Sequence, residues 1–211
     1  MKICTLCPRM CAVDRKSGER GICGQTTEIK VARAALHFWE EPCISGEMGS
    51  GAVFFSGCAL HCVFCQNENI ANGTAGKVIS TGRLGKIFLE LQEKGANNIN
   101  LVTPGQFVPQ IIKAVELARN QNLKIPIVYN TSSYENVDTI RSLEGIVDIY
   151  LPDFKYFDTA LSAKYSHAPD YPAVAKAVIA EMVRQTGAAV FENGEDSLMK
   201  RGTIVRHLIL P

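Results

Sequence analysis

Three cysteines are spaced so that their thiolates could bind one inorganic cluster. They form the pattern Cys58-x3-Cys62-x2-Cys65, directly after an apolar run at 52–55 that predicts a buried strand. Thiolates are soft ligands that favour iron–sulfur clusters and zinc. A cubane cluster usually has four cysteine ligands, so three would leave one iron with an open position, which is typical of a reactive centre. The alternative is a zinc site with a distant fourth ligand such as Cys43.

A second group of cysteines lies at the start of the chain, in the pattern Cys4-x2-Cys7-x3-Cys11-x11-Cys23. Four thiolates close the coordination sphere of a structural zinc ion or of a plain cluster. A zinc ion would organise a small lobe that has little core, whereas an auxiliary cluster would relay electrons or anchor a substrate. The sequence leaves both open. The eighth cysteine, Cys43, is expected to be a buried thiol.

Length and composition exclude several classes of protein. The chain has 211 residues, of which 46% are hydrophobic, and a net charge of +1. This length suits one domain with a small appendage, and the charge disfavours a nucleic-acid partner. No run approaches the roughly 18 apolar residues of a membrane span or provides a signal peptide. Cysteines bunched in the first third of such a chain favour reduced thiols in a cytoplasmic protein over disulfides.

Short apolar runs alternate with helical periodicities after residue 51. The runs predict five strands, and the periodicities predict helices between them. This order is typical of β-α-β units, so we expect an α/β fold with a parallel sheet. The expected strands are 52–55, 99–102, 125–129, 147–151 and 203–210, and the expected helices are 84–91, 108–115, 137–143 and 175–182.

Polar side chains follow three of these strands, at the edge where parallel sheets bind ligands. Each group also has a plainer interpretation. The first group would form a strand-to-helix turn, the second would cap a helix, and the third would be a surface ion pair. Thr103, Gly105 and Gln106 follow the second strand, Asn130 and Ser132 follow the third, and Asp153 and Lys155 follow the fourth.

The segment from Gly57 to Asn67 resembles the radical S-adenosylmethionine (SAM) superfamily. It reads GCALHCVFCQN and matches the CxxxCxφC motif, including the aromatic Phe64 before the last cysteine. The resemblance implies a [4Fe–4S] cluster on the three cysteines, SAM on the open iron, and Phe64 and Asn67 among the cofactor-binding residues. The reduced cluster would cleave SAM to methionine and a 5′-deoxyadenosyl radical, which abstracts a hydrogen atom from the substrate. An electron donor such as flavodoxin or ferredoxin is then implied.

Other segments resemble a narrower group, an uncharacterised branch near the pyruvate formate-lyase activating enzymes. These segments are 40–46, 101–105, 129–132 and 151–156. The resemblance implies that the polar residues at the strand ends face SAM and that the substrate is a protein glycyl site or another C–H bond. The superfamily's usual Gly-Gly-Glu stretch is replaced by Thr103-Pro104-Gly105-Gln106. Gln106 or backbone carbonyls would therefore accept the hydrogen bonds of the SAM amino group.

The resemblance also implies a six-stranded partial barrel, whereas five strands are expected. We therefore expect a Cys-rich metal-binding lobe at 1–50 and a partial (β/α)6 TIM-like barrel at 51–211 that lacks its last strand. A sixth parallel strand at 31–36 would change this count. The uncovered strand at 203–210 leads us to expect a fragment or a shortened member.

Two points about function stay open in the sequence. Arg206 and His207 alternate within the last expected strand and point to opposite faces, so one of them could reach the site, and the pattern does not decide which. The plainer interpretation is a structural pair. The expected activity is that of a radical SAM enzyme, and activation of a glycyl radical enzyme is one candidate for its reaction. The alternative is a non-enzymatic zinc or iron–sulfur binding module.

Overall fold

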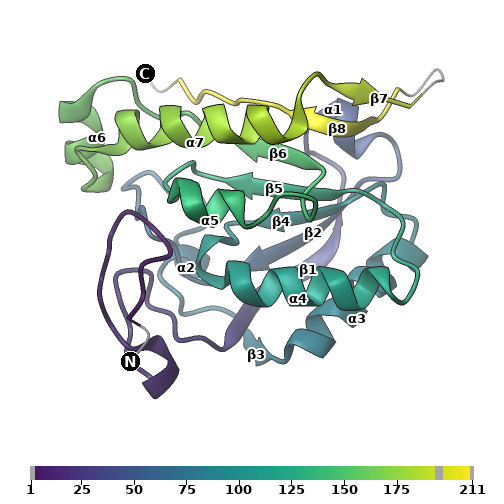
Figure 1. Cartoon of the computed structure of the whole chain (residues 1–211), viewed down its shortest axis with the longest axis horizontal. Helices are drawn as coiled ribbons and strands as arrows, with labels where there is room; N and C mark the ends of the chain where they lie inside the picture. Colours follow the sequence, from purple (N-terminus) through teal and green to yellow (C-terminus); the bar gives the residue numbers. More distant parts are fainter. Residues whose placement is uncertain (1–2, 193–196, 210–211) are drawn as a thin grey trace.

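Five parallel strands form the centre of the sheet in the computed structural model, which describes residues 3–192 and 197–209 (Figure 1). The described residues give the strand order β3-β1-β2-β4-β5-β6-β8-β7. Strand β1 runs antiparallel to β2 and β3, and β7 runs antiparallel to β8. The strands are β1 (Ile29–His37), β2 (Ser50–Phe55), β3 (Lys77–Ile79), β4 (Ile99–Val102), β5 (Ile127–Thr131), β6 (Ile149–Pro152), β7 (Val190–Phe191) and β8 (Met199–Thr203).

Helices α3, α4, α5 and α7 cover one face of this sheet, and α1 packs on the other face (Figure 1). Within the described ranges, no helix combines the length and the apolar character that a membrane crossing needs. The α-helices are α1 (Pro42–Ser45), α2 (Glu68–Ala71), α3 (Thr81–Glu93), α4 (Val108–Arg119), α5 (Val137–Arg141), α6 (Thr159–Ser166) and α7 (Tyr171–Thr186), and two 3-10 turns are η1 (Arg15–Ser17) and η2 (Gly105–Phe107).

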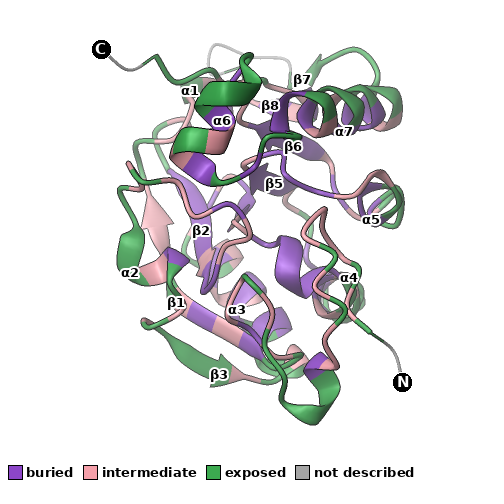
Figure 2. Ribbon diagram, turned by 90° about the vertical axis from the view of Figure 1, so that its left-hand side faces the viewer, coloured by how far each residue is buried: buried purple, intermediate pink, exposed green. Residues whose placement is uncertain are grey.

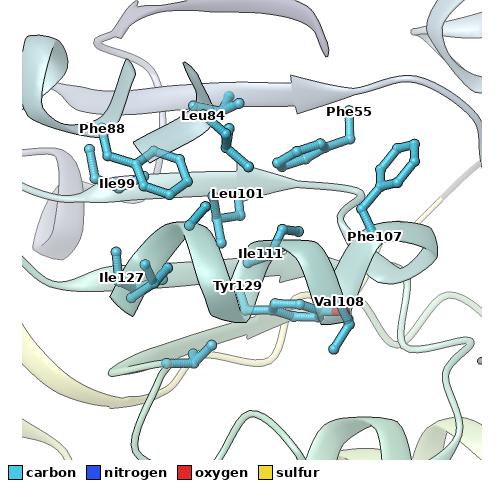
Figure 3. Packing of buried hydrophobic residues seen from close by; sticks show 14 of the residues in the cluster. Phe55, Leu84, Phe88, Ile99, Leu101, Phe107, Val108, Ile111, Ile127 and Tyr129 are labelled. Carbon is cyan, nitrogen blue, oxygen red and sulfur yellow. The ribbon is translucent and has the colours of Figure 1, made fainter. Parts of the chain in front are cut away.

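The main core lies between the sheet and these four helices. Leu84 and Phe88 of α3 and Ile111 of α4 pack with Leu101 and Tyr129 of the central strands (Figure 3). Apolar residues three and four apart share one helix face, which explains why the helical periodicity marks the inward side. Buried residues gather in the strands and on the inward helix faces, while the outward helix faces are exposed (Figure 2). This packing holds the carboxyl ends of the parallel strands at one edge.

The predicted α/β class is confirmed. The apolar runs at 52–55 and 99–102 lie in β2 and β4. The periodicities at 84–91 and 175–182 lie in α3 and α7. In the described part of the chain the sheet is mostly parallel and ends at β3 and β7, and the finer prediction of a partial barrel stays a prediction.

The prediction of a fifth strand at 203–210 is wrong in its bounds. Strand β8 ends at Thr203, and Arg206 makes an isolated bridge with Asp153. Beyond β8, Ile204 still packs against the cluster around α1, whereas Val205, Leu208 and Ile209 are 46–84% exposed, and Leu210 lies outside the described residues. The run at 31–36 is a strand, but it is antiparallel to β2 and supplies no sixth parallel strand. Apolar alternation marks a strand without giving its direction.

Candidate functional site

The three clustered cysteines line a cavity at the carboxyl ends of the parallel strands. Cys58, Cys62 and Cys65 lie on the loop that follows β2, and they form one end of a cavity of about 510 Å³. Residues after β4, β5, β6 and β8 form its other walls. We name this space the thiol cavity. Its position agrees with the rule that parallel α/β sheets bind ligands at this edge.

The backbone at the start of the cysteine loop requires glycine. Gly57 has φ +87°, and a Cβ added to it would lie 2.4 Å from the carbonyl oxygen of Cys23. The loop therefore touches the backbone of the N-terminal segment. The backbone N–H of Leu60 donates to the Sγ of Cys58 at 3.4 Å. The His61 ring contacts the Ile22 carbonyl at 2.9 Å, so this histidine also contacts the N-terminal segment.

An aromatic cluster backs the cysteine loop. Phe64 packs edge-on against Tyr156, with 6.2 Å between the ring centroids, and Tyr156 packs edge-on against Tyr171 at 5.4 Å. Cys58 and Cys62 pack against this cluster. Burial raises the pKa of the Cys58 thiol above its ordinary value. Because metals bind thiolates, loading the site would release protons.

The donor set fits a cluster better than a lone ion. In the part of the chain that the structure describes, no three Cys, His, Asp or Glu side chains are placed to hold a single metal ion. In a cubane, by contrast, each thiolate binds a different iron. Three thiols that line one cavity and pack against an aromatic cluster therefore suit a [4Fe–4S] cluster, in which they would bind three of the four irons.

Charged side chains also line the thiol cavity. Asp153 and Lys155 pair at 2.7 Å, and both side chains are mostly buried rather than exposed on the surface. Arg206 pairs with Asp153 at 2.9 Å, whereas the ring of the adjacent His207 packs against Phe154. The arginine is therefore the member of the Arg206–His207 pair that faces the cavity.

Of the twelve residues predicted to bind the cluster or SAM, the structure brings ten around this cavity and places two elsewhere. Those around it are Cys58, Cys62, Phe64, Cys65, Asn67, Thr103, Asn130, Ser132, Asp153 and Lys155. Gly105 and Gln106 line a neighbouring pocket. The Gln106 amide nitrogen donates to the carbonyls of Ser56, Gly57 and Thr103 at 2.9–3.0 Å, so it fastens the cysteine loop to the end of β4.

The backbone of Thr103 is strained where it meets the cavity. Its φ is +55°, a value that β-branched residues rarely adopt. Its N–H donates to the Asn130 carbonyl at 2.9 Å, which continues the pairing of β4 with β5 past the end of β4. Strain of this kind collects at ligand sites.

Sequence reasoning missed three residues that line the thiol cavity. Arg33 and His37 lie on β1 and face it, and Glu40 follows β1. Recognition of β1 as a strand would have placed Arg33 and His37 on one face, because side chains two and four apart share a face. No sequence pattern marks Glu40 apart from its neighbour Glu41.

The N-terminal segment, residues 3–28, packs beside the cysteine loop and α5 (Figure 1). The Arg9 guanidinium donates to the carbonyls of Ala59 at 2.8 Å and Ser166 at 2.9 Å. The Thr139 hydroxyl donates to the Leu6 carbonyl at 2.8 Å. These contacts fix a segment that has little regular secondary structure.

Three of the four N-terminal cysteines line the neighbouring pocket, which measures about 30 Å³. Cys4, Cys7 and Cys23 face it together with Glu135. Burial raises the pKa of Cys7 to about 12 and also raises the pKa of Cys23. Cys11 accepts a backbone N–H from Ile22 at 3.4 Å. Cys43 packs instead against the apolar cluster around α1.

Glu135 is a buried carboxyl that faces this small pocket. Its Oε1 accepts hydrogen bonds from the Thr131 hydroxyl at 2.8 Å and the Tyr129 hydroxyl at 3.3 Å. Its Oε2 has no hydrogen-bond partner among the described residues. Burial raises the pKa of Glu135 from 4.5 to about 7.

This pKa predicts a pH dependence of stability. Between pH 4.5 and about 7 folded Glu135 keeps a proton that the unfolded chain releases, so the free energy of unfolding falls as pH rises through this window. We expect Glu135→Gln to flatten this slope in thermal unfolding measured from pH 5 to 8. Glu116→Gln, a change at an exposed position of α4, should leave the slope unchanged. Equal slopes in wild type and Glu135→Gln would contradict the assignment.

Comparison with known proteins gives two matches. A family model described as a 4Fe-4S single cluster domain matches residues 44–168, a range that contains the cysteine loop and Asp153. An uncharacterized protein of Methanocaldococcus jannaschii is 27% identical over 217 residues. That alignment covers 100% of this chain and 57% of the relative, so the chain spans little more than half of the relative's length.

Proposed function

The chain belongs to the 4Fe-4S single cluster domain family, and from that membership we propose that it is a radical SAM enzyme with its active site in the thiol cavity. The family is associated with radical SAM proteins. The observation that carries the proposal is the position of three thiols at one end of a cavity whose other walls are polar strand ends. The cavity volume of about 510 Å³ is typical of small-molecule sites.

The cluster would supply the electron that cleaves SAM to methionine and a 5′-deoxyadenosyl radical, which takes a hydrogen atom from the substrate. In the proposal, Cys58, Cys62 and Cys65 hold three of its irons. The aromatic cluster behind the loop excludes water from the thiolates. Asn130 and Lys155, with the other polar residues around the cavity, bind the polar groups of SAM.

The finer features of the proposal concern partners and the N-terminal cysteines. A flavodoxin or ferredoxin would deliver the electron near Val63, which is 65% exposed between Cys62 and Cys65. The substrate would be a glycyl radical enzyme or a small molecule. Cys4, Cys7, Cys11 and Cys23 would hold a second metal centre, either zinc or an iron–sulfur cluster, in a lobe that precedes a partial barrel. Because no three of these side chains are placed to hold a single ion in the described structure, a zinc ion would require the thiols to move closer together. Reduced thiols suit a cytoplasmic location.

Electron paramagnetic resonance tests whether SAM binds at the cluster. The protein is reconstituted anaerobically with iron and sulfide, reduced with dithionite, and measured with and without SAM. We expect a reduced [4Fe–4S] signal whose g values change when SAM is added, because SAM occupies the open iron. An unchanged signal would argue against the proposal and favour a non-enzymatic iron–sulfur module.

A further inference from the structure

Four charged side chains of alternating sign line the thiol cavity together with the three cysteines. In order they are Glu40, Arg206, Asp153 and Lys155, and we name them the charge chain. The three ion pairs measure 2.8, 2.9 and 2.7 Å. The residues come from segments after β1, β6 and β8. The two carboxylates and the two cations cancel, so the charge chain as a group of four side chains carries no net charge.

Arg206 is the branch point of this arrangement. Its Nε donates to Asp153 Oδ1 at 2.9 Å, its Nη1 to Glu40 Oε1 at 2.8 Å, and its Nη2 to the Asn130 side-chain oxygen at 2.9 Å. The side chain of Arg206 is 28% exposed and that of Glu40 only 10%. A planar guanidinium can make three such bonds in fixed directions, and a lysine ammonium cannot reproduce this fork.

These bonds determine how the cavity residues are oriented. Because Arg206 binds Oδ1 of Asp153, the other oxygen, Oδ2, is left to hold the Lys155 ammonium. The amide of Asn130 is held at both ends, with its oxygen on Arg206 and its nitrogen donating to Glu40 Oε2 at 3.1 Å. The orientations of Asn130 and Lys155 therefore depend on Arg206.

The backbone already attaches this part of the chain to the sheet. The Arg206 N–H donates to the Pro152 carbonyl at 2.9 Å, and the Phe154 N–H donates to the Arg206 carbonyl at 2.7 Å. The guanidinium is therefore not needed to attach the segment. Its contacts all lie on the cavity side of the sheet.

We propose that Arg206, braced by Glu40, is a positioning residue that orients Asn130, Asp153 and Lys155 for binding SAM in the thiol cavity. The inference rests on the proposed function, because SAM is the ligand that these groups would meet. In this inference Arg206 acts through its neighbours and does not contact the reacting atoms. Its removal would leave Glu40 and Asp153 as partly buried carboxylates without their shared counter-ion.

The test compares Arg206→Gln, Arg206→Lys and a matched control, Arg119→Gln. Arg119 is also a partly buried arginine, and it binds Asp148 at 3.2 Å and the carbonyls of Gly145 and Ile146. Each protein is reconstituted anaerobically, and its iron content, melting temperature and dissociation constant for SAM are measured. The SAM titration follows the change in the signal of the reduced cluster.

We expect Arg206→Gln to keep its cluster and to raise the SAM dissociation constant about tenfold, which corresponds to the loss of one charge-assisted contact network. Arg206→Lys should recover only part of this affinity. Arg119→Gln should bind SAM like the wild type even if its melting temperature falls as far as that of Arg206→Gln. In an Arg206→Gln/Asp153→Asn double variant the two effects should not add.

Three outcomes would overturn the inference. If the wild type shifts its signal with SAM and Arg206→Gln binds SAM equally well, Arg206 positions nothing in the site, and the proposed function still stands. If Arg119→Gln weakens SAM binding as much as Arg206→Gln does, the effect is one of general stability. If the wild type itself shows no response to SAM, the proposed function fails and the inference fails with it.

Discussion

Cys62→Ala is expected to abolish SAM cleavage and to remove most of the cluster iron. Only two of the three thiolates that line the thiol cavity would remain, Cys58 and Cys65, and two ligands would hold the cluster poorly. Loss of outer partners of metal ligands already costs about 10- to 100-fold in affinity or activity, so loss of a ligand should exceed a hundredfold or so. Iron analysis, the visible absorption of the reconstituted protein and product assay measure the effect.

Cys43→Ala is the matched control for this substitution. Cys43 is also half-buried, but it packs against Ile44, Val128 and their apolar neighbours rather than lining the thiol cavity. We expect this variant to keep its cluster and its activity. Full turnover in Cys62→Ala, or an equal loss in Cys43→Ala, would show that the cluster is bound elsewhere.

Gly57→Ala is expected to destabilise the protein and to separate the cysteine loop from the N-terminal segment. The left-handed backbone at φ +87° costs an L-residue about 1–2 kcal/mol. The added Cβ would also meet the backbone carbonyl of Cys23 at 2.4 Å and the Gln25 side chain at 2.6 Å. A backbone atom cannot move aside as a flexible side chain can. We therefore expect the free energy of unfolding to fall by about 2–4 kcal/mol, at the upper end of what single substitutions usually cost.

Thermal unfolding of the reconstituted variants measures this cost. Gly145→Ala serves as the control, because Gly145 has a similar φ of +76° and nothing within 4 Å of an added Cβ. It should therefore show the backbone penalty alone. A drop in melting temperature for Gly57→Ala that is no larger than for Gly145→Ala would refute the close approach of the two segments.

The sequence predicted the parts of the fold that local pattern determines. Leu84, Phe88 and Leu91 recur at helical spacing, and they form the buried face of α3. Three of the four residues at 99–102 are apolar because β4 is central in the sheet. The fifth strand was placed too late because Val205, Leu208 and Ile209 are apolar and yet exposed, a property that depends on what packs over them.

The sequence predicted which strand ends surround the candidate site, but it did not predict which side chains pair with one another there. The spacing of Cys58, Cys62 and Cys65 marks a loop, and the polar residues after the later strands lie around the same cavity. The choice of Arg206 over His207 depends on the position of Glu40, which is 166 residues away in the sequence. The direction of the Gln106 amide likewise depends on carbonyls of the cysteine loop. Partners so distant leave no local pattern.

The most direct test of the central claim is the formation of 5′-deoxyadenosine. The anaerobically reconstituted wild-type protein is reduced, mixed with SAM, and analysed by liquid chromatography and mass spectrometry beside the Cys62→Ala variant. We predict that the wild type forms 5′-deoxyadenosine and methionine and that the variant forms neither. A wild-type protein that carries a full [4Fe–4S] cluster and yields no 5′-deoxyadenosine would contradict the proposal that this cavity cleaves SAM.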